Sequence, residues 1–248
     1  MEWSPELTRT AIAVVVLGAI TTTVLLGSRV RASWAPVLAV LRAVVQLAAI
    51  GLILGGIIAD PLWVAVAVSV MFLVGVLTVS GRLGWRLAQV AAIAASMALG
   101  LLVVLVIVFW TGAIEFAPRY VLAIGGITIG GVMQVATIGG RHLHEGLISR
   151  WDEVEGWLAL GATRRESTID IARRSVYSAL VPSTDQAKTA GLVALPGSFV
   201  GAIFGGASPL EAARFQVVVF AALLAAASIT VTLLTRMLAP VRFKPDPR

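Results

Sequence analysis

The chain contains no cysteine among its 248 residues. This absence excludes disulfide frameworks, zinc sites with thiolate ligands, iron–sulfur clusters and cysteine nucleophiles. Charge is also scarce, because Asp, Glu, Lys and Arg make up only 13% of the sequence. A soluble domain carries about 25% charged residues. With 58% hydrophobic residues and a mean hydropathy of +0.96, the chain is predicted to be an all-α polytopic membrane protein.

Motifs for nucleotide hydrolysis and for common hydrolases are missing as well. The sequence has no phosphate-binding G-x-x-x-x-G-K-[ST] loop, so ATP hydrolysis is not predicted for this chain itself. It has neither the H-E-x-x-H pattern of zinc proteases nor a Ser in a G-x-S-x-G turn. We therefore expect a protein that is not an enzyme and binds no cofactor of its own. The net charge of +6 is attributed to cytoplasmic loops and not to a nucleic-acid partner.

Seven apolar segments follow one another along what we predict to be a single transmembrane domain, residues 1–248. The first five are each close to the ~20 residues that cross a hydrocarbon core. Several starts carry helix-initiating residues, namely Asp60-Pro61, Pro118 and the capping box Ser208-Pro209-Leu210-Glu211. The segments cover approximately residues 7–27, 36–58, 61–80, 87–110, 118–140, 178–206 and 210–235.

The distribution of Lys and Arg predicts the orientation of these segments. If the N-terminus is outside, 14 of the 19 basic residues fall in loops or ends on the inner side, and three fall on the outer side. Basic residues concentrate on the cytoplasmic side of membrane proteins. We therefore expect a multi-pass protein of the inner or plasma membrane, with its N-terminus outside and its C-terminus in the cytoplasm.

One long polar interruption, residues 141–177, has the pattern of a helix–turn–helix hairpin. Trp151, Val154 and Leu158 repeat at helical spacing. Gly161 stands where the first helix would end, and Thr163 begins a capping box that would start the second. Two interpretations remain open for this loop: an amphipathic element lying on the lipid surface, or a docking element for a cytoplasmic partner.

Residues 155–163, EGWLALGAT, resemble the EAA loop of bacterial ABC-transporter permeases, in which a Glu and a Gly six residues later frame the helix that contacts the ATPase. Gly156 and Trp157 replace the usual alanines, and the I-x-L-P that follows in that family is absent. Three further stretches resemble the FetB family of iron-export permeases: LRAVVQL at 41–47, IEFAP at 114–118 and PSTDQAKTAGLVALPG at 182–197. Phe204, Pro209 and Gln216 continue this similarity, which extends from about residue 36 to 235.

This resemblance implies a transmembrane permease subunit that exports a metal ion, with iron as the first candidate. ATP and Mg would be bound by a separate ATPase subunit, and the permease would form a homodimer. The residues implied in coupling to the ATPase are Glu155, Gly161, Ala162 and Thr163.

Polar and helix-breaking residues within the apolar segments are candidates for a translocation pathway. Arg42 and Gln46 are four residues apart and share one helix face, where they serve either in helix packing or in the pore. Leu195-Pro196-Gly197 is predicted to break the sixth segment and to line the pathway, because broken backbone is tolerated in a membrane only inside protein or along a cavity.

Two carboxylates in or next to the apolar segments are candidate metal ligands. Asp185 and Lys188 can form an ion pair, so Asp185 is either a structural partner of Lys188 or an oxygen ligand for the cation. Glu115, at the outer end of the fourth segment, is either a solvated acid or a second oxygen ligand. His142 and His144 are two residues apart, which places them on different helix faces and makes a shared metal site unfavourable.

The ionisable residues and the broken segment also fit a different class of protein. A secondary transporter or channel driven by an ion gradient, carrying a metal ion or small solute, would have such features near the bilayer midplane. The polar hairpin at 141–177 separates the two hypotheses, because a secondary transporter does not require it.

Overall fold

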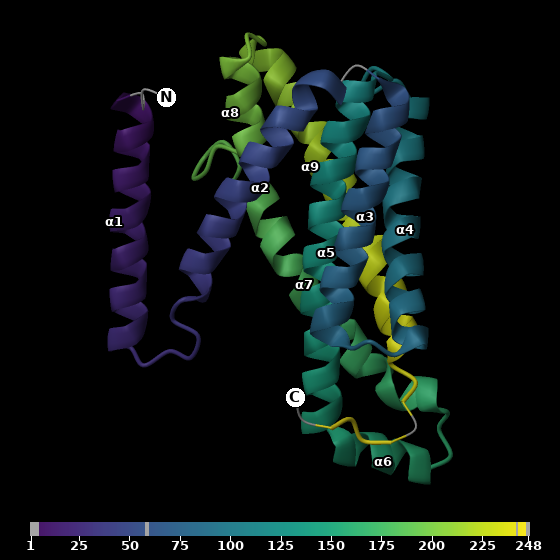
Figure 1. The fold of residues 1–248 in the computed structure, drawn as a ribbon. Helices are drawn as coiled ribbons and strands as arrows, with labels where there is room; N and C mark the ends of the chain where they lie inside the picture. Colours follow the sequence, from purple (N-terminus) through teal and green to yellow (C-terminus); the bar gives the residue numbers. More distant parts are fainter. Residues whose placement is uncertain (1–4, 58–59, 242, 247–248) are drawn as a thin grey trace. The chain divides into compact units, whose positions relative to one another are not determined.

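The computed structural model describes residues 5–57, 60–241 and 243–246, and within them the chain is helical apart from turns and one isolated bridge between Ala190 and Ala194 (Figure 1). This architecture confirms the predicted all-α fold. The helices are α1 (Pro5–Gly27), α2 (Ala35–Ile57), α3 (Pro61–Leu83), α4 (Leu87–Trp110), α5 (Pro118–Ser149), α6 (Trp151–Ala159), α7 (Arg164–Thr189), α8 (Gly197–Phe204) and α9 (Pro209–Leu238).

Five of these helices are long and apolar enough to cross a membrane: α1, α3, α4, α5 and α9. A shorter apolar stretch, Ala35–Gly51, lies in α2. The segment predicted at 178–206 is not among the spanning helices, because it is divided between the end of α7, a turn and α8. The polytopic class is therefore confirmed, while the boundaries of that segment are corrected.

The chain divides into two compact units, one up to Ile57 and one from Ile58 onward. In the first unit α1 and α2 contact each other. Their connection includes two residues in the left-handed region, Arg29 at φ +53° and Ala32 at φ +60°. Among the described side chains of this unit only Thr22 and Ser33 are buried. Both helices thus present mostly apolar side chains outward, as helices in contact with lipid do.

In the second unit α5 is the central helix and contacts α3, α4, α6, α7 and α9 (Figure 1). Helix α4 packs closely on α9 because Gly100 has no side chain. A Cβ at that position would lie 2.7 Å from the carbonyl oxygen of Ala226. Beside it Thr230 donates a hydrogen bond to the Ser96 carbonyl oxygen at 3.2 Å. Small residues and hydroxyls of this kind hold helices together in membranes.

The helix starts predicted from capping residues are confirmed. The Asp60 side chain accepts a hydrogen bond from the Leu62 amide at 2.8 Å, with Pro61 as the first residue of α3. Ser208 and Glu211 form a reciprocal capping box at the start of α9. Pro118 is the first residue of α5. These starts were predictable because each depends on residues within one turn of the helix end.

The predicted boundary between the fifth segment and the polar loop is wrong. Helix α5 does not end near residue 140 but continues to Ser149, so the loop predicted to begin at 141 starts as helix. Its last two turns bury Leu143 and Leu147 in a cluster with Trp151, Val154 and Ile171. This cluster extends the bundle core beyond the apolar segment, which is why hydropathy alone placed the boundary too early.

Candidate functional site

The predicted hairpin is present and consists of α6, a turn and α7. One face of α6 is attached to the end of α5, because Trp151 and Val154 are buried there. The Trp151 indole Nε1 donates a hydrogen bond to a carboxylate oxygen of Glu155 at 2.6 Å. The Glu of the EAA-like motif is therefore held by the first residue of its own helix.

A second side-chain pair fixes the junction between α5 and α6. The Arg150 guanidinium contacts both carboxylate oxygens of Glu153, with Nε 2.8 Å from Oε1. The hydrogen bond from Arg150 lowers the pKa of Glu153 below its ordinary value. Two hydrogen bonds from one guanidinium group stabilise a carboxylate and also fix its orientation. Helix α6 is thus positioned by contacts at its N-terminal end and by its buried face.

The turn after α6 has the geometry that the sequence predicted. Gly161 has φ +90°, a conformation that side chains with a Cβ rarely adopt. Its amide donates to the Leu158 carbonyl oxygen at 3.0 Å, and the Ala162 amide donates to the Trp157 carbonyl oxygen at 3.0 Å. This pair of bonds is a Schellman motif, which satisfies the last carbonyl groups of a helix.

Helix α7 begins with the predicted capping box. The Glu166 amide donates to Thr163 Oγ1 at 3.3 Å, and Glu166 Oε2 accepts from the Thr163 amide at 2.8 Å. Hydrogen bonds from the Thr163 hydroxyl and amide lower the pKa of Glu166. The ionised carboxylate therefore stabilises the folded hairpin, and this contribution is lost only as the pH falls through the lowered pKa.

The structure brings the four predicted coupling residues together at the tip of the hairpin, since Glu155, Gly161, Ala162 and Thr163 all lie in α6 or the turn. Two large apolar side chains are exposed at the same tip, Trp157 at 55% and Leu160 at 81%. The sequence analysis gave these two residues no role of their own. A signal was available for Leu160, which falls on the side of the helical wheel away from the buried Trp151 and Val154, whereas Trp157 is three residues from Val154 and borders the buried face.

The sixth predicted segment is broken near Pro196 and not at Pro182, the other proline that it contains. Helix α7 continues through Pro182 to Thr189. The chain then turns at Gly191, which has φ +81° and whose amide donates to the Ala194 carbonyl oxygen at 2.9 Å. Pro196 is the N-cap of α8. The prediction of a helix break at Leu195-Pro196-Gly197 is therefore confirmed.

Residues on both sides of this break are accessible in the single chain. Leu195 and Gly197 are exposed, and Pro196 is half-buried. Helix α8 is held to α9 by a hydrogen bond that the sequence analysis missed, in which the Ser198 hydroxyl donates to Gln216 Oε1 at 2.5 Å. Gln216 is buried at 7% exposure in an otherwise apolar helix. A lone amide in such a helix is itself a signal of a polar contact.

The predicted ion pair on α7 is confirmed. Lys188 Nζ lies 3.7 Å from Asp185 Oδ1, and the two side chains are 69% and 59% exposed respectively. Neither side chain is packed inside the chain, so both are available to a ligand, a partner or lipid. The role of Asp185 as a metal ligand stays a prediction.

The remaining predicted residues belong to other elements of the chain. Arg42 and Gln46 are exposed on α2, in the first compact unit. Glu115 precedes α5 and forms an exposed ion pair with Arg119 at 3.7 Å. Within residues 5–57, 60–241 and 243–246, no three or more His, Asp or Glu side chains gather closely enough to hold a metal ion.

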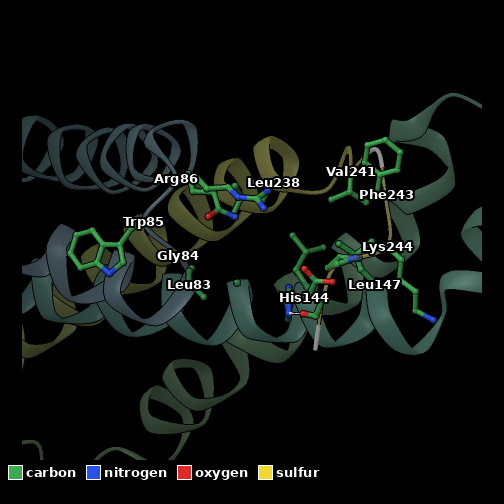
Figure 2. Close-up of a pocket in the computed structure, with 15 residues that line it drawn as sticks. Leu83, Gly84, Trp85, Arg86, His144, Leu147, Leu238, Val241, Phe243 and Lys244 are labelled. Carbon is green, nitrogen blue, oxygen red and sulfur yellow. Dashed lines mark hydrogen bonds between the residues drawn. The ribbon is translucent and has the colours of Figure 1, made fainter. Parts of the chain in front are cut away.

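A further cavity is lined by none of the predicted site residues. It has a volume of about 810 Å³ and lies where the ends of α3, α5 and α9 meet the residues after α9. Figure 2 shows His144 beside the C-terminal segment, where its Nε2 lies 3.0 Å from the Asp246 carbonyl oxygen. His142 is engaged elsewhere, 3.8 Å from Glu145. The two histidines therefore have different neighbours.

Comparison with known proteins identifies relatives over most of the chain. The profile of the family described as "Uncharacterised protein family (UPF0014)" matches residues 8–243. The UPF0014 membrane protein STAR2 of Oryza sativa subsp. japonica is 37% identical over 212 residues, which cover 83% of this chain and 73% of that protein. The UPF0014 membrane protein YjkA of Bacillus subtilis (strain 168) is 31% identical over 84% of both chains.

A further relative carries a functional name. The probable iron export permease protein FetB of Escherichia coli (strain K12) is 36% identical over 128 residues, which cover 52% of this chain and 49% of that protein. No solved structure matches the chain. These relatives are named as membrane proteins or permeases and not as enzymes, which agrees with the multi-pass helical architecture. The chain therefore belongs to the UPF0014 family of membrane proteins, as its resemblance to FetB-type permeases predicted.

Proposed function

We propose that this chain is the transmembrane subunit of an ABC transporter that exports a metal ion, with iron as the first candidate. The α6–α7 hairpin carries this proposal. Its inner face is built into the bundle through Trp151 and Val154, while Trp157 and Leu160 are exposed at its tip. A helix that is rigidly attached on one face and exposes large apolar side chains at its tip fits a groove in a partner protein.

The attachment of the hairpin favours docking over a loose position on the lipid surface. Helix α6 is joined to α5 by the Arg150–Glu153 contact, and the turn is closed by a Schellman motif and a capping box. A force applied at the tip is therefore passed to α5 and α7 and not absorbed by a flexible loop. In this proposal ATP and Mg are bound by the partner ATPase, and two permease chains pair with two ATPase subunits.

The nature of the cargo is inferred from relatives and from the carboxylates. FetB is named as a probable iron export permease, and a plant relative that is 40% identical over 46% of this chain is named ALUMINUM SENSITIVE 3. Both names concern hard metal ions or their effects, and such ions prefer oxygen ligands. Asp185 on α7 and Glu115 before α5 are the oxygen donors that we assign to the path of the cation.

The experiment measures ATPase binding and cell metal together. The chain is co-expressed with a candidate ABC ATPase subunit, and cellular iron is measured under iron overload with and without each subunit. We expect co-purification of the ATPase and a lower iron content only when both subunits are present. Replacing Trp157 and Leu160 with Ser should abolish co-purification and export. Export without any ATPase would contradict the proposal and favour a gradient-driven transporter.

A further inference from the structure

A cavity of about 410 Å³ lies between α7 and α9, at the end of the bundle that carries the hairpin. Its wall on α7 is formed by residues at helical spacing, including Arg165, Arg173 and Val176. Its wall on α9 includes Thr232 and Arg236, and Arg236 belongs to the last turn of that helix. Three guanidinium groups from two different helices therefore border one cavity.

This arrangement is more specific than the general excess of arginine in this part of the chain. Arg164 and Arg174 lie next to the cavity residues in the sequence of α7, but neither lines the cavity. Of the three arginines that do line it, Arg165 and Arg173 lie on α7 and Arg236 lies at the end of α9, a helix that contacts α7. Only some of the basic residues in this region therefore line the cavity.

The cavity has no anionic counterpart among the described residues. No Asp or Glu lines it. Arg173 has an exposed ion pair with Asp170 at 3.4 Å, and an exposed pair of this kind contributes little. In the described part of the chain, the guanidinium groups of Arg165 and Arg236 form neither a hydrogen bond nor an ion pair. A concave site with three unneutralised or weakly neutralised guanidinium groups favours an anion.

The shape of the site indicates which anion. Guanidinium groups bind phosphate through paired N–H donors, so the charged rim suits a phosphate. From Arg165 to Val176 the wall on α7 extends over about 16 Å at 1.5 Å per residue, and the apolar side chains of Ile169, Ala172 and Val176 alternate along it with the two arginines. A site that combines guanidinium groups with an apolar wall, beside the membrane-spanning helix α9, matches a lipid and not a fully water-soluble ligand.

We propose that the cavity between α7 and α9 binds the phosphate headgroup of an anionic phospholipid, with Arg165, Arg173 and Arg236 contacting the phosphate and the acyl chains lying along α9. A lipid bound there would connect the helix that follows the hairpin with the last membrane-spanning helix. Neither the family nor the proposed transport function assigns a ligand to this place, and the site does not depend on the identity of the transported ion.

The test measures binding of short-chain lipids to the purified full-length chain by native mass spectrometry. We expect short-chain phosphatidylglycerol to bind saturably and more tightly than phosphatidylcholine with the same chains. The double variant Arg165→Gln, Arg236→Gln should bind phosphatidylglycerol about 30-fold more weakly, since each basic residue contributes about fivefold to anionic-lipid binding. The matched control Arg164→Gln, Arg174→Gln removes the same charge outside the cavity and should keep the wild-type affinity.

Three results would overturn the assignment. Equal affinity for the two lipids on the wild-type chain would show that the headgroup is not recognised, and this measurement needs no variant to fold. Displacement of the lipid by inorganic phosphate at equal concentration would make the cavity a site for free phosphate. An equal loss in the control variant would show that only the total charge matters.

Discussion

At the scale of single residues, Asp185 has the two roles that the sequence left open, a structural partner of Lys188 or a ligand of the cation. The two groups are 3.7 Å apart and exposed within the single chain. An exposed ion pair in water contributes little to stability. An unpaired charge near a bilayer centre is unfavourable by about 2.5–3.5 kcal/mol, so either member alone is costly if this part of α7 lies in the membrane.

We predict that Asp185 is a ligand, and a double substitution tests it. Asp185→Ala alone leaves Lys188 unpaired and is expected to lower the yield of folded protein. Adding Lys188→Met removes both charges and should restore folding and ATPase binding, while export, measured as cellular metal content, stays absent. Full export by the double variant would reduce Asp185 to a structural partner of Lys188.

At the scale of helices and turns, the hairpin depends on Gly161. A residue with a Cβ at φ +90° is strained by roughly 1–2 kcal/mol relative to glycine. No atom lies within 4 Å of a Cβ placed there, so the strain is confined to the backbone of the turn and does not reach the bundle core.

We expect Gly161→Val to separate ATP hydrolysis from export while the bundle stays folded. The measurement is the ratio of metal exported to ATP hydrolysed in reconstituted vesicles, together with the Tm of the purified chain. Gly156→Ala is the matched control, because Gly156 lies inside α6 with open space around it and alanine favours a helix there. Unchanged coupling in the Gly161→Val protein would show that the turn of the EAA-like motif is not needed for coupling.

The same elements show which structural features could be predicted from the sequence. The capping boxes at Thr163 and Ser208 and the turn at Gly161 were predictable, because each is determined by residues within about one helical turn. The end of α5 was not predictable, because Leu143 and Leu147 are buried in a cluster that includes Ile171 of α7. That contact forms only after the hairpin has folded back, so local hydropathy does not reveal it. Hydropathy indicates where a chain meets lipid and does not indicate where a helix ends.

Pro182 shows a second limit of local reasoning. A proline inside a helix removes one backbone hydrogen bond and crowds the preceding turn. Val181 and Pro182 are both exposed on α7, so the ring meets no tightly packed neighbour there. The surrounding contacts of α7 with α5 and α9 keep the helix continuous. Among the site residues, the hairpin set and the Asp185–Lys188 pair lie together as their spacing along the chain predicted, whereas Arg42, Gln46 and Glu115 belong to other elements.

At the scale of the whole molecule, the glycines in and directly after α8 bear on how two copies of the chain associate. Gly197, Gly201 and Gly205 recur every four residues, a spacing typical of close helix contacts in membranes. Within the described chain, a Cβ at Gly197 or Gly201 would meet no atom within 4 Å. The close contacts between helices of one chain lie elsewhere, for example at Gly100 and Gly139.

We therefore predict that Gly201 contacts a second copy of the chain. Gly201→Leu should leave the Tm of the single chain unchanged and shift the purified protein from dimer to monomer in light scattering. Gly27→Leu, at another position with open space around it, is the control and should remain dimeric. If Gly201→Leu remains a dimer and exports normally, this face of α8 contacts lipid.

The length of helix α5 determines how far one of its ends moves when the helix tilts about the other end. The helix contains 32 residues without interruption, from Pro118 to Ser149, and is therefore about 48 Å long. One end carries the hairpin, and the other end begins three residues after Glu115. A rigid rod of this length amplifies small rotations: a tilt of about 10° about the hairpin end displaces the far end by about 8 Å. In the proposed transporter, a modest movement of the ATPase at the hairpin end of α5 would be large enough to open or close a passage for the ion near its other end.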